Sequence, residues 1–209
     1  MPVDPNTMYR WRTWTTEQRQ TILTERKSRK NPFHSPPHKV SEETSLYLIT
    51  AACFEHRSII GFSESRLEQF SSKLCDLLAE RCTQVFAWVV LPNHYHFLAQ
   101  VSELKLLFSE IGKLHGRKSF EWNNEESKRG RQVWCKAAET AMKSEGHFFA
   151  SLNYVMNNPV HHGYCSKWLD WPFSSADEYL EKMGREKALY FWQRYPLNNY
   201  GQSWDPPDL

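Results

Sequence analysis

Short hydrophobic blocks along the chain predict the strands of a β-sheet. Residues 46–54 are apolar almost throughout, which is typical of a strand buried in the middle of a sheet. Residues 85–91 form a second block, and residues 94–101 follow directly after a Pro-Asn turn as a third. A shorter block at 132–135 predicts a fourth strand.

Amphipathic stretches separate these blocks and predict helices. Residues 65–82 place Leu and Phe side chains at helical spacing between the first two strands. Residues 102–122 repeat this pattern, with Ser102 as the predicted N-cap. A third predicted helix, 144–159, is capped by its first serine and ended by Pro159.

The order strand–helix–strand–strand–helix–strand (βαββαβ) predicts an α+β fold of the ferredoxin-like type. Such a fold has an antiparallel sheet with both helices on one face, which leaves the opposite face open for chemistry. The third helix is an addition at the C-terminal side of this unit. The predicted organisation is an N-terminal basic and aromatic extension at 1–43, a main domain at 44–176, and a C-terminal helix and tail at 177–209.

Composition narrows the class of protein but does not select a function. The 209 residues suffice for one sizeable domain, and no apolar run is long enough for a transmembrane helix. The first residues lack the features of a signal peptide, and the 5 cysteines are an odd number, which together predict a cytoplasmic protein with reduced thiols. The net charge of +2 means that any nucleic-acid contact depends on local patches. The 1–43 extension either packs its tryptophans on the main domain or contacts phosphates.

Two histidines on the third strand form the first candidate functional feature. Side chains alternate between the two faces of a strand, so His94 and His96 point the same way while Tyr95 points the other way. Two imidazoles held side by side on a stiff strand can hold one divalent metal ion. Taken alone, the pattern is more often two half-buried polar residues than a metal site.

The third predicted helix adds a phenol and an amide. Tyr154 and Asn158 are four residues apart, which places them one above the other on the same helix face. Each has a simpler interpretation, Tyr154 as a core tyrosine and Asn158 as a turn residue before a proline. Together with His94 and His96, however, the amide oxygen completes a three-point metal site with positions left for substrate oxygens.

Two motifs in this order carry a family resemblance. The stretches 91–98 (LPNHYHFL) and 152–164 (LNYVMNNPVHHGY) resemble those of the REP-associated tyrosine transposases, a single-tyrosine branch of the His-hydrophobic-His (HUH) endonucleases. Shorter stretches at 47–50, 171–175 and 200–207 are similar to the same family. The likeness covers most of the chain from about residue 9.

The resemblance implies an enzyme that cuts and rejoins single-stranded DNA next to hairpins formed by repetitive extragenic palindromes. Tyr154 would be the nucleophile of a covalent 5′-phosphotyrosine intermediate. A divalent ion, Mg²⁺ or Mn²⁺, would be held by His94, His96 and Asn158. The sequence departs from the family pattern in three places: at Tyr95, where an aliphatic residue is usual; at 161–162, where His-His stands in place of a frequent basic residue; and at 137–140, where Ala-Ala-Glu-Thr replaces a more aromatic stretch.

The predicted partner is single-stranded DNA with a hairpin, in a cytoplasmic and nucleoid-associated protein. Oligomeric state stays open between monomer and homodimer. Two other hypotheses stay open as well, a non-catalytic hairpin-binding protein and a phosphodiesterase that uses water. Clustered cations near the end of the second helix are the candidate DNA-binding residues, although charged helix ends are often only solvated. These candidates are Lys113, Arg117, Lys118, Lys128, Arg129 and Arg131. The closing segment 204–207 is a candidate for folding back over the active site.

Overall fold

The computed structural model describes residues 46–198 together with Thr15, Glu17, Thr21 and Tyr200. Apart from these positions, the predicted 1–43 extension and the tail beyond Tyr200 lie outside the described residues. In the part of the chain that is described, no helix combines the length and the hydrophobicity needed to cross a bilayer. All 5 cysteines are free thiols, and of these only Cys53 is fully buried.

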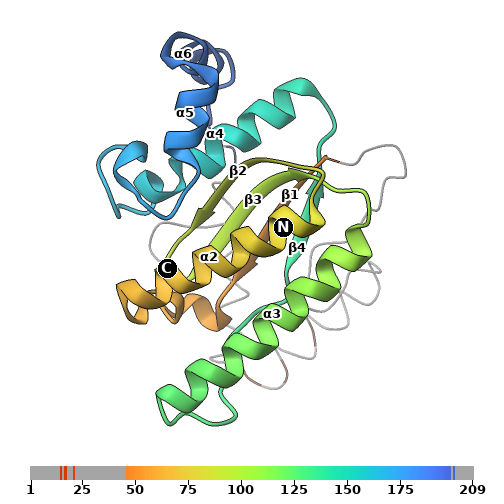
Figure 1. Cartoon of the computed structure of the whole chain (residues 1–209), viewed down its shortest axis with the longest axis vertical. Coiled ribbons are helices and arrows are strands. Elements are labelled where there is room, and N and C mark those ends of the chain that lie inside the picture. Colours follow the sequence, from red (N-terminus) through yellow and green to blue (C-terminus); the bar gives the residue numbers. More distant parts are fainter. Residues whose placement is uncertain (1–14, 16, 18–20, 22–45, 199, 201–209) are drawn as a thin grey trace.

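The centre of the fold is a four-stranded antiparallel sheet. Its strands stand in the order β2-β3-β1-β4, and each neighbouring pair is antiparallel. This is the predicted ferredoxin-like arrangement, in which the two strands of the β2–β3 hairpin lie on one side of β1 and β4 lies on the other (Figure 1). The strands are β1 Leu46–Ala52, β2 Gln84–Val90, β3 His94–Gln100 and β4 Ala138–Ala141.

The prediction of the fourth strand at 132–135 is wrong by several residues, since β4 begins later. Trp134 forms only an isolated bridge to Cys53. Between the pair Thr50↔Ala138 and the bridge Cys53↔Trp134, the segment opposite β1 contains one residue more than the β1 side. The extra residue interrupts the ladder in the manner of a β-bulge. The predicted segment therefore extends the same sheet edge but is not the strand itself.

Helices cover both faces of the sheet. α2 and α3 pack on one face, as predicted, and α4 packs on the other face against β2 and β3 (Figure 1). The expectation that the second face is open is therefore wrong, because the third predicted helix occupies it. The helices are α2 Glu64–Arg81, α3 Leu104–Glu125, α4 Glu145–His161, α5 Ala176–Met183 and α6 Arg185–Arg194, with single 3₁₀ turns at Phe54–His56, Ile60–Phe62 and Trp168–Asp170.

Two of the five described α-helices begin with a serine side chain that caps them. The Ser144 hydroxyl accepts a hydrogen bond from the His147 amide and starts α4, as predicted, and Ser63 does the same for α2. Ser102 is not the cap of α3. That helix begins one residue after Glu103, whose side chain makes no capping hydrogen bond.

Pro159 does not end α4, contrary to the prediction, because the helix continues to His161. Proline lacks only its own amide donor, so the following turn can still close through the bond from the His162 amide to the Asn158 carbonyl. Gly163, with φ of +71°, then turns the chain out of the helix. As a result Asn158 keeps helical geometry and stays in line with Tyr154.

β3 divides its side chains between two separate cores. Tyr95 and Phe97 pack into the core beneath α2 and α3, whereas Leu98 packs into the core beneath α4. His94 and His96 share the α4 side with Leu98, and both are about 1% exposed. The predicted alternation of β3 is thereby confirmed, and it directs both imidazoles toward α4.

The larger core is built from stacked aromatic rings. Phe70 is fully buried, and its ring centroid lies 5.6 Å from that of Tyr95 and 5.3 Å from that of Trp134. The His115 ring stacks on Trp134 at 3.9 Å, and its Nε2 lies 3.0 Å from the Tyr95 hydroxyl. The buried phenol of Tyr95 thus has a hydrogen-bond partner, as burial of a hydroxyl requires.

Truncation of this aromatic core should destabilise the fold strongly. We expect Phe70→Ala to lower the free energy of unfolding by about 3–5 kcal/mol, because it removes buried ring contacts and leaves a cavity. The matched control is Phe120→Ala, since Phe120 is 78% exposed; it should change stability by no more than about 0.5 kcal/mol. Urea unfolding followed by circular dichroism measures both, and similar values for the two variants would contradict the assignment of the core.

Acid should weaken the fold through His115. Burial lowers the pKa of His115 to about 3, whereas an unfolded histidine titrates near about 6.5. Between these values the unfolded chain binds the additional proton, so the free energy of unfolding falls as the pH falls. We expect this residue to contribute a loss of about 2 kcal/mol between about pH 8 and about pH 5. Urea unfolding at several pH values should show a shallower dependence in His115→Leu, and an unchanged slope would refute this origin.

Candidate active site

His94 is held between two asparagine side chains. Its Nδ1 lies 2.7 Å from the Asn93 Oδ1, and its Nε2 lies 2.9 Å from the Asn158 Oδ1. The Asn93 amide nitrogen donates to the carbonyl of His56 at 3.1 Å, which fixes the orientation of that amide. The Asn93 oxygen therefore faces His94 and accepts the hydrogen bond from its Nδ1–H.

This arrangement leaves two lone pairs facing each other. When Nδ1 of a neutral His94 carries the proton, its Nε2 is an acceptor and points at the Asn158 Oδ1, which is also an acceptor. The Asn158 amide nitrogen has no hydrogen-bond partner in the described part of the chain, and the side chain is fully buried. A cation bound between the two atoms, or a half-turn of the Asn158 amide that directs its N–H at Nε2, would make such a contact favourable.

The two ligand atoms fit a divalent ion in their spacing. Adjacent ligands of an octahedral ion with bonds of about 2.1 Å are about 3.0 Å apart, and the Nε2–Oδ1 distance is 2.9 Å. In the described residues, no three His, Cys, Asp or Glu side chains are grouped so that they could hold a metal. The predicted site therefore depends on the amide of Asn158 as its third ligand.

His96 is fixed by the neighbouring strand. Thr50 of β1 stands directly opposite His96 in the sheet register, and its hydroxyl lies 2.8 Å from the His96 Nδ1. This contact holds one ring nitrogen and directs the other away from β1, as the second contact of a metal-ligating histidine typically does. The rings of His94 and His96 are 5.0 Å apart, centroid to centroid.

Tyr154 lies on the facing surface of α4. Its ring centroid is 5.1 Å from that of His96, and the side chain is only 3% exposed. Asn158, one helical turn later, meets His94. The four residues predicted to form the site, from two elements far apart in the sequence, thus converge in one buried place.

Four further side chains complete this place and were not assigned a role from the sequence. Thr50 and Asn93 hold the far sides of the two imidazoles. His162 lies 4.9 Å from His94 between ring centroids, and Tyr200 lies 5.9 Å from Tyr154. Helical spacing from Asn158 would have identified His162, because it is four residues further along. The role of Thr50 is not visible in the sequence, because it depends on the pairing of β1 with β3.

The predicted DNA-binding cations lie on the other side of the sheet from this site. They belong to α3 and the turn that follows it, which cover the face opposite α4. Most of them form ion pairs, and Arg117 and Arg129 form none with described residues. The pairs are Lys113 with Glu110, Lys118 with Glu121, and both Lys128 and Arg131 with Glu126, at 2.6–3.1 Å. Hydrogen bonds from Arg131, Arg66 and Lys128 hold the pKa of Glu126 well below its usual range.

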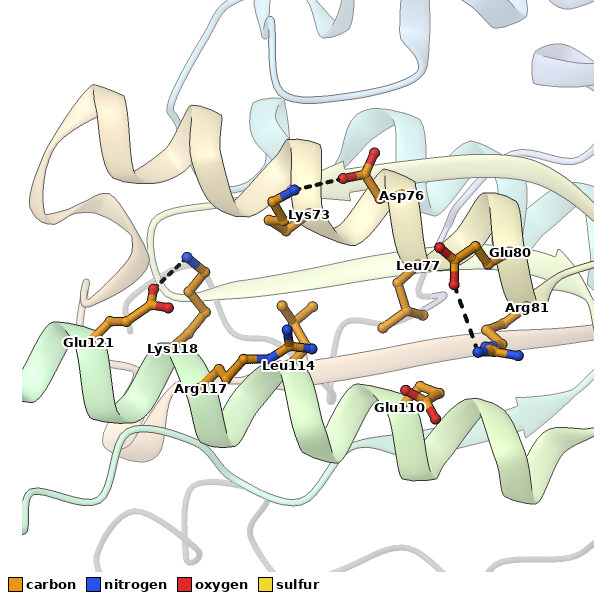
Figure 2. A pocket seen from close by; sticks show the side chains of 10 residues that line it. All are labelled: Lys73, Asp76, Leu77, Glu80, Arg81, Glu110, Leu114, Arg117, Lys118 and Glu121. Atoms are coloured by element: carbon orange, nitrogen blue, oxygen red, sulfur yellow. Dashed lines mark hydrogen bonds and ion pairs between the residues drawn. The ribbon is translucent and has the colours of Figure 1, made fainter.

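A groove of about 310 Å³ between α2 and α3 contains two of these cations, as Figure 2 shows. Its floor includes Leu77 and Leu114, and its walls carry as many acidic as basic side chains. The acidic residues are Asp76, Glu80, Glu110 and Glu121, and the basic ones are Lys73, Arg81, Arg117 and Lys118. Dashed contacts in Figure 2 join three of these pairs within the groove. A groove of balanced charge lacks the excess of positive charge that follows a nucleic-acid backbone.

The contact of Thr50 with His96 makes the predicted metal site testable. We expect Thr50→Val, which removes the hydroxyl and keeps the shape, to weaken Mn²⁺ binding by about 10-fold to 100-fold, because the His96 ring loses its fixed orientation. Titration calorimetry measures this affinity without any need for activity. Thr140→Val on β4 is the matched control and should bind Mn²⁺ as the parent protein does. Equal affinity in all three proteins would show that Thr50 does not support a metal ligand.

Comparisons with known proteins bear on the fold. No family model matches the sequence, and a search of curated proteins finds no match. Among solved structures, the chain is similar to a REP-associated tyrosine transposase bound to a REP hairpin, with a TM-score of 0.53 and 20% sequence identity. The match covers 69% of this chain and 84% of that one. That structure is of the family that the two sequence motifs resemble, and the match shows that this chain has its fold.

Proposed function

We propose that this protein is a metal-dependent single-strand DNA endonuclease and strand transferase that acts next to DNA hairpins. The observation that carries the proposal is the meeting of Tyr154 with His94, His96 and Asn158 in one buried site. The similar solved structure supports the choice of substrate, since that protein is bound to a REP hairpin. The motif resemblance supports the choice of reaction.

The chemistry needs these residue types. A phosphodiester is negatively charged and its leaving alkoxide is poor, so the reaction requires charge neutralisation and an oriented nucleophile. In the proposal His94, His96 and Asn158 hold a divalent ion, which when bound supplies positive charge at the scissile phosphate. Mixed nitrogen and oxygen ligands from the protein suit Mn²⁺. Mg²⁺ would also be accepted, because water and substrate oxygens would fill the remaining coordination positions.

Tyr154 is the proposed nucleophile. Its phenol oxygen forms a bond to the phosphorus while the bond from phosphorus to the 3′-oxygen breaks, which leaves a 5′-phosphotyrosine and a free 3′-hydroxyl. The phenol gives up its proton and the departing 3′-oxygen takes one up, so protons balance. The energy of the phosphodiester is kept in the phosphotyrosine, and the strand can be rejoined by the reverse reaction without ATP.

Burial of the site sets a condition on substrate entry. Tyr154 and the two histidines are at most 3% exposed, and Tyr200 packs against Tyr154. A scissile phosphate therefore reaches the phenol only if neighbouring side chains move aside. The proposed fold-back of 204–207 over the site concerns residues outside those described. It stays a prediction, with Tyr200 marking the described end of the chain beside the site.

The six predicted DNA-binding cations take a secondary role in the proposal. They lie across the sheet from Tyr154, so they are proposed to contact phosphates of the hairpin at a distance from the cut. Arg129 is the strongest of the set, because it forms no ion pair with a described residue, whereas Arg117 lies in the groove of balanced charge. DNA bound in this way implies a nucleoid-associated protein, as either a monomer or a homodimer.

The decisive test is formation of a covalent adduct. A hairpin-bearing single-stranded oligonucleotide incubated with the protein and Mn²⁺ or Mg²⁺ should give a protein–DNA adduct that survives denaturing electrophoresis. Tyr154→Phe should abolish the adduct, because the variant keeps the ring and lacks the nucleophilic oxygen. Tyr200→Phe is the matched control, since it removes the neighbouring phenol, and it should still form the adduct.

The other outcomes identify the rival functions. Cleavage without an adduct, unchanged in Tyr154→Phe, indicates a phosphodiesterase that uses water. Hairpin binding that survives EDTA, with neither cleavage nor adduct, indicates a non-catalytic binding protein. An adduct that persists in Tyr154→Phe and disappears in Tyr200→Phe assigns the nucleophile to Tyr200, beyond the end of α6, and defeats the proposal as stated.

A further inference from the structure

A row of rings leads outward from the buried site. The His162 ring centroid lies 4.9 Å from that of His94, and the Tyr164 centroid lies 6.4 Å from that of His162. Trp171 follows, with its centroid 5.4 Å from that of Tyr164. The row consists of His162, Tyr164 and Trp171, and we call it the aromatic row.

Backbone contacts hold the aromatic row in place. The left-handed conformation of Gly163 folds the chain back after α4, so that the Tyr164 amide donates to the Pro159 carbonyl at 2.9 Å. The Trp171 indole N–H donates to the Val90 carbonyl, at the end of β2, also at 2.9 Å. The backbone of Tyr164 and the indole of Trp171 are thus each tied to a regular element, which reduces the conformational entropy lost when a ligand stacks on these rings.

Exposure rises from the buried site to Tyr164. His94 is about 1% exposed, whereas Tyr164 is 39% exposed and is one of the large apolar side chains at the surface; Trp171, the last ring of the row, is half-buried against the core beneath α4. The planes of Tyr164 and Trp171 are inclined by 37°, so the two rings form a shallow angled surface. Only the His162 ring lies between Tyr164 and His94, which is a proposed metal ligand.

We propose that Tyr164 and Trp171 form a stacking platform for an unpaired base next to the phosphodiester held at the His94 site. This proposal rests on the proposed DNA chemistry. A nucleic-acid base is the proposed ligand because the row of ring contacts connects Tyr164 to the site that would hold the scissile phosphodiester. Aromatic side chains bind unpaired bases through their flat faces and do so with little dependence on sequence. A paired base inside a helix has both faces covered by its neighbours and is excluded, so the platform selects single-stranded flanks.

The experiment measures binding with cleavage switched off. The probe is a hairpin oligonucleotide with a single-stranded flank in which one base is replaced by 2-aminopurine, whose fluorescence falls when it stacks. The protein is the full chain carrying Tyr154→Phe, so that a covalent step does not interfere. We expect quenching at one or two flank positions. We also expect Tyr164→Ala to remove that quenching and to weaken binding by roughly 5-fold to 100-fold, the range for one lost base–aromatic stack.

Two controls separate stacking from loss of structure. Tyr164→Phe keeps the ring and should retain both quenching and affinity. Tyr190→Ala removes a tyrosine on α6 that is 55% exposed and should have no effect. An oligonucleotide without a base at the quenched position should bind the parent and Tyr164→Ala equally weakly, because the same stack is missing from both complexes.

The outcomes distinguish this proposal from the proposed function. Quenching that depends on Tyr164, in a protein that never forms an adduct at Tyr154, supports the platform and overturns the strand-transfer chemistry. An adduct at Tyr154 with unchanged quenching and affinity in Tyr164→Ala overturns the platform alone. Loss of binding in Tyr164→Phe as large as that in Tyr164→Ala also overturns it, since the aromatic ring would then not be the feature that binds.

Discussion

The site depends on one constraint, the alternation of side chains along a strand that is buried on both faces. β3 has helices above and below it, so each of its side chains must suit one core or the other. Tyr95 and Phe97 pack into the aromatic core, and His94 and His96 therefore face α4, because side chains alternate along the strand. A shift of one residue in the register of β3 would place two imidazoles among hydrocarbon and a phenol and a benzene ring against Asn158. The hydrophobic packing of the fold therefore protects the orientation of the polar site.

The polar site in turn joins three separate elements. Thr50 holds His96 from β1, Asn93 holds His94 from the turn before β3, and Asn158 meets His94 from α4. The Asn93 amide is itself held by the backbone of the turn after β1. Each imidazole thus has one nitrogen fixed by the scaffold and the other directed toward α4 or the space beside it. Such a division allows a histidine to serve as a preorganised ligand, because no rotation of the ring is needed when an ion arrives.

Local patterns in the sequence predicted most of the fold and the four central site residues. The strands β1 to β3 and the alternation of β3 follow from hydrophobic periodicity, and the pairing of Tyr154 with Asn158 follows from helical spacing. What failed depended on tertiary contacts. β4 is short, half-buried and weakly apolar, so the more strongly apolar pattern at 132–135 predicts the strand in its place. The continuation of α4 through Pro159 and its docking on the second face of the sheet are set by packing, which sequence periodicity does not contain. Thr50 has a role only because the sheet register places it opposite His96.

Two of the three departures from the motifs of the transposases that the sequence resembles differ in where the structure places them. Tyr95 replaces a usual aliphatic residue, but its side chain lies on the far side of the sheet from Tyr154. Its hydroxyl is satisfied by His115 there, so the substitution affects the core and leaves the site unchanged. His162 is the residue that caps the C-terminus of α4, four positions after Asn158, and its ring centroid lies 4.9 Å from that of His94. A departure that faces the site changes the surroundings of the proposed ion and begins the aromatic row toward the surface. Alternation on a strand turns Tyr95 away from the face that carries His94 and His96, whereas helical spacing brings a residue four positions after Asn158 back toward the site. The geometry of each element therefore decides which substitutions affect the site.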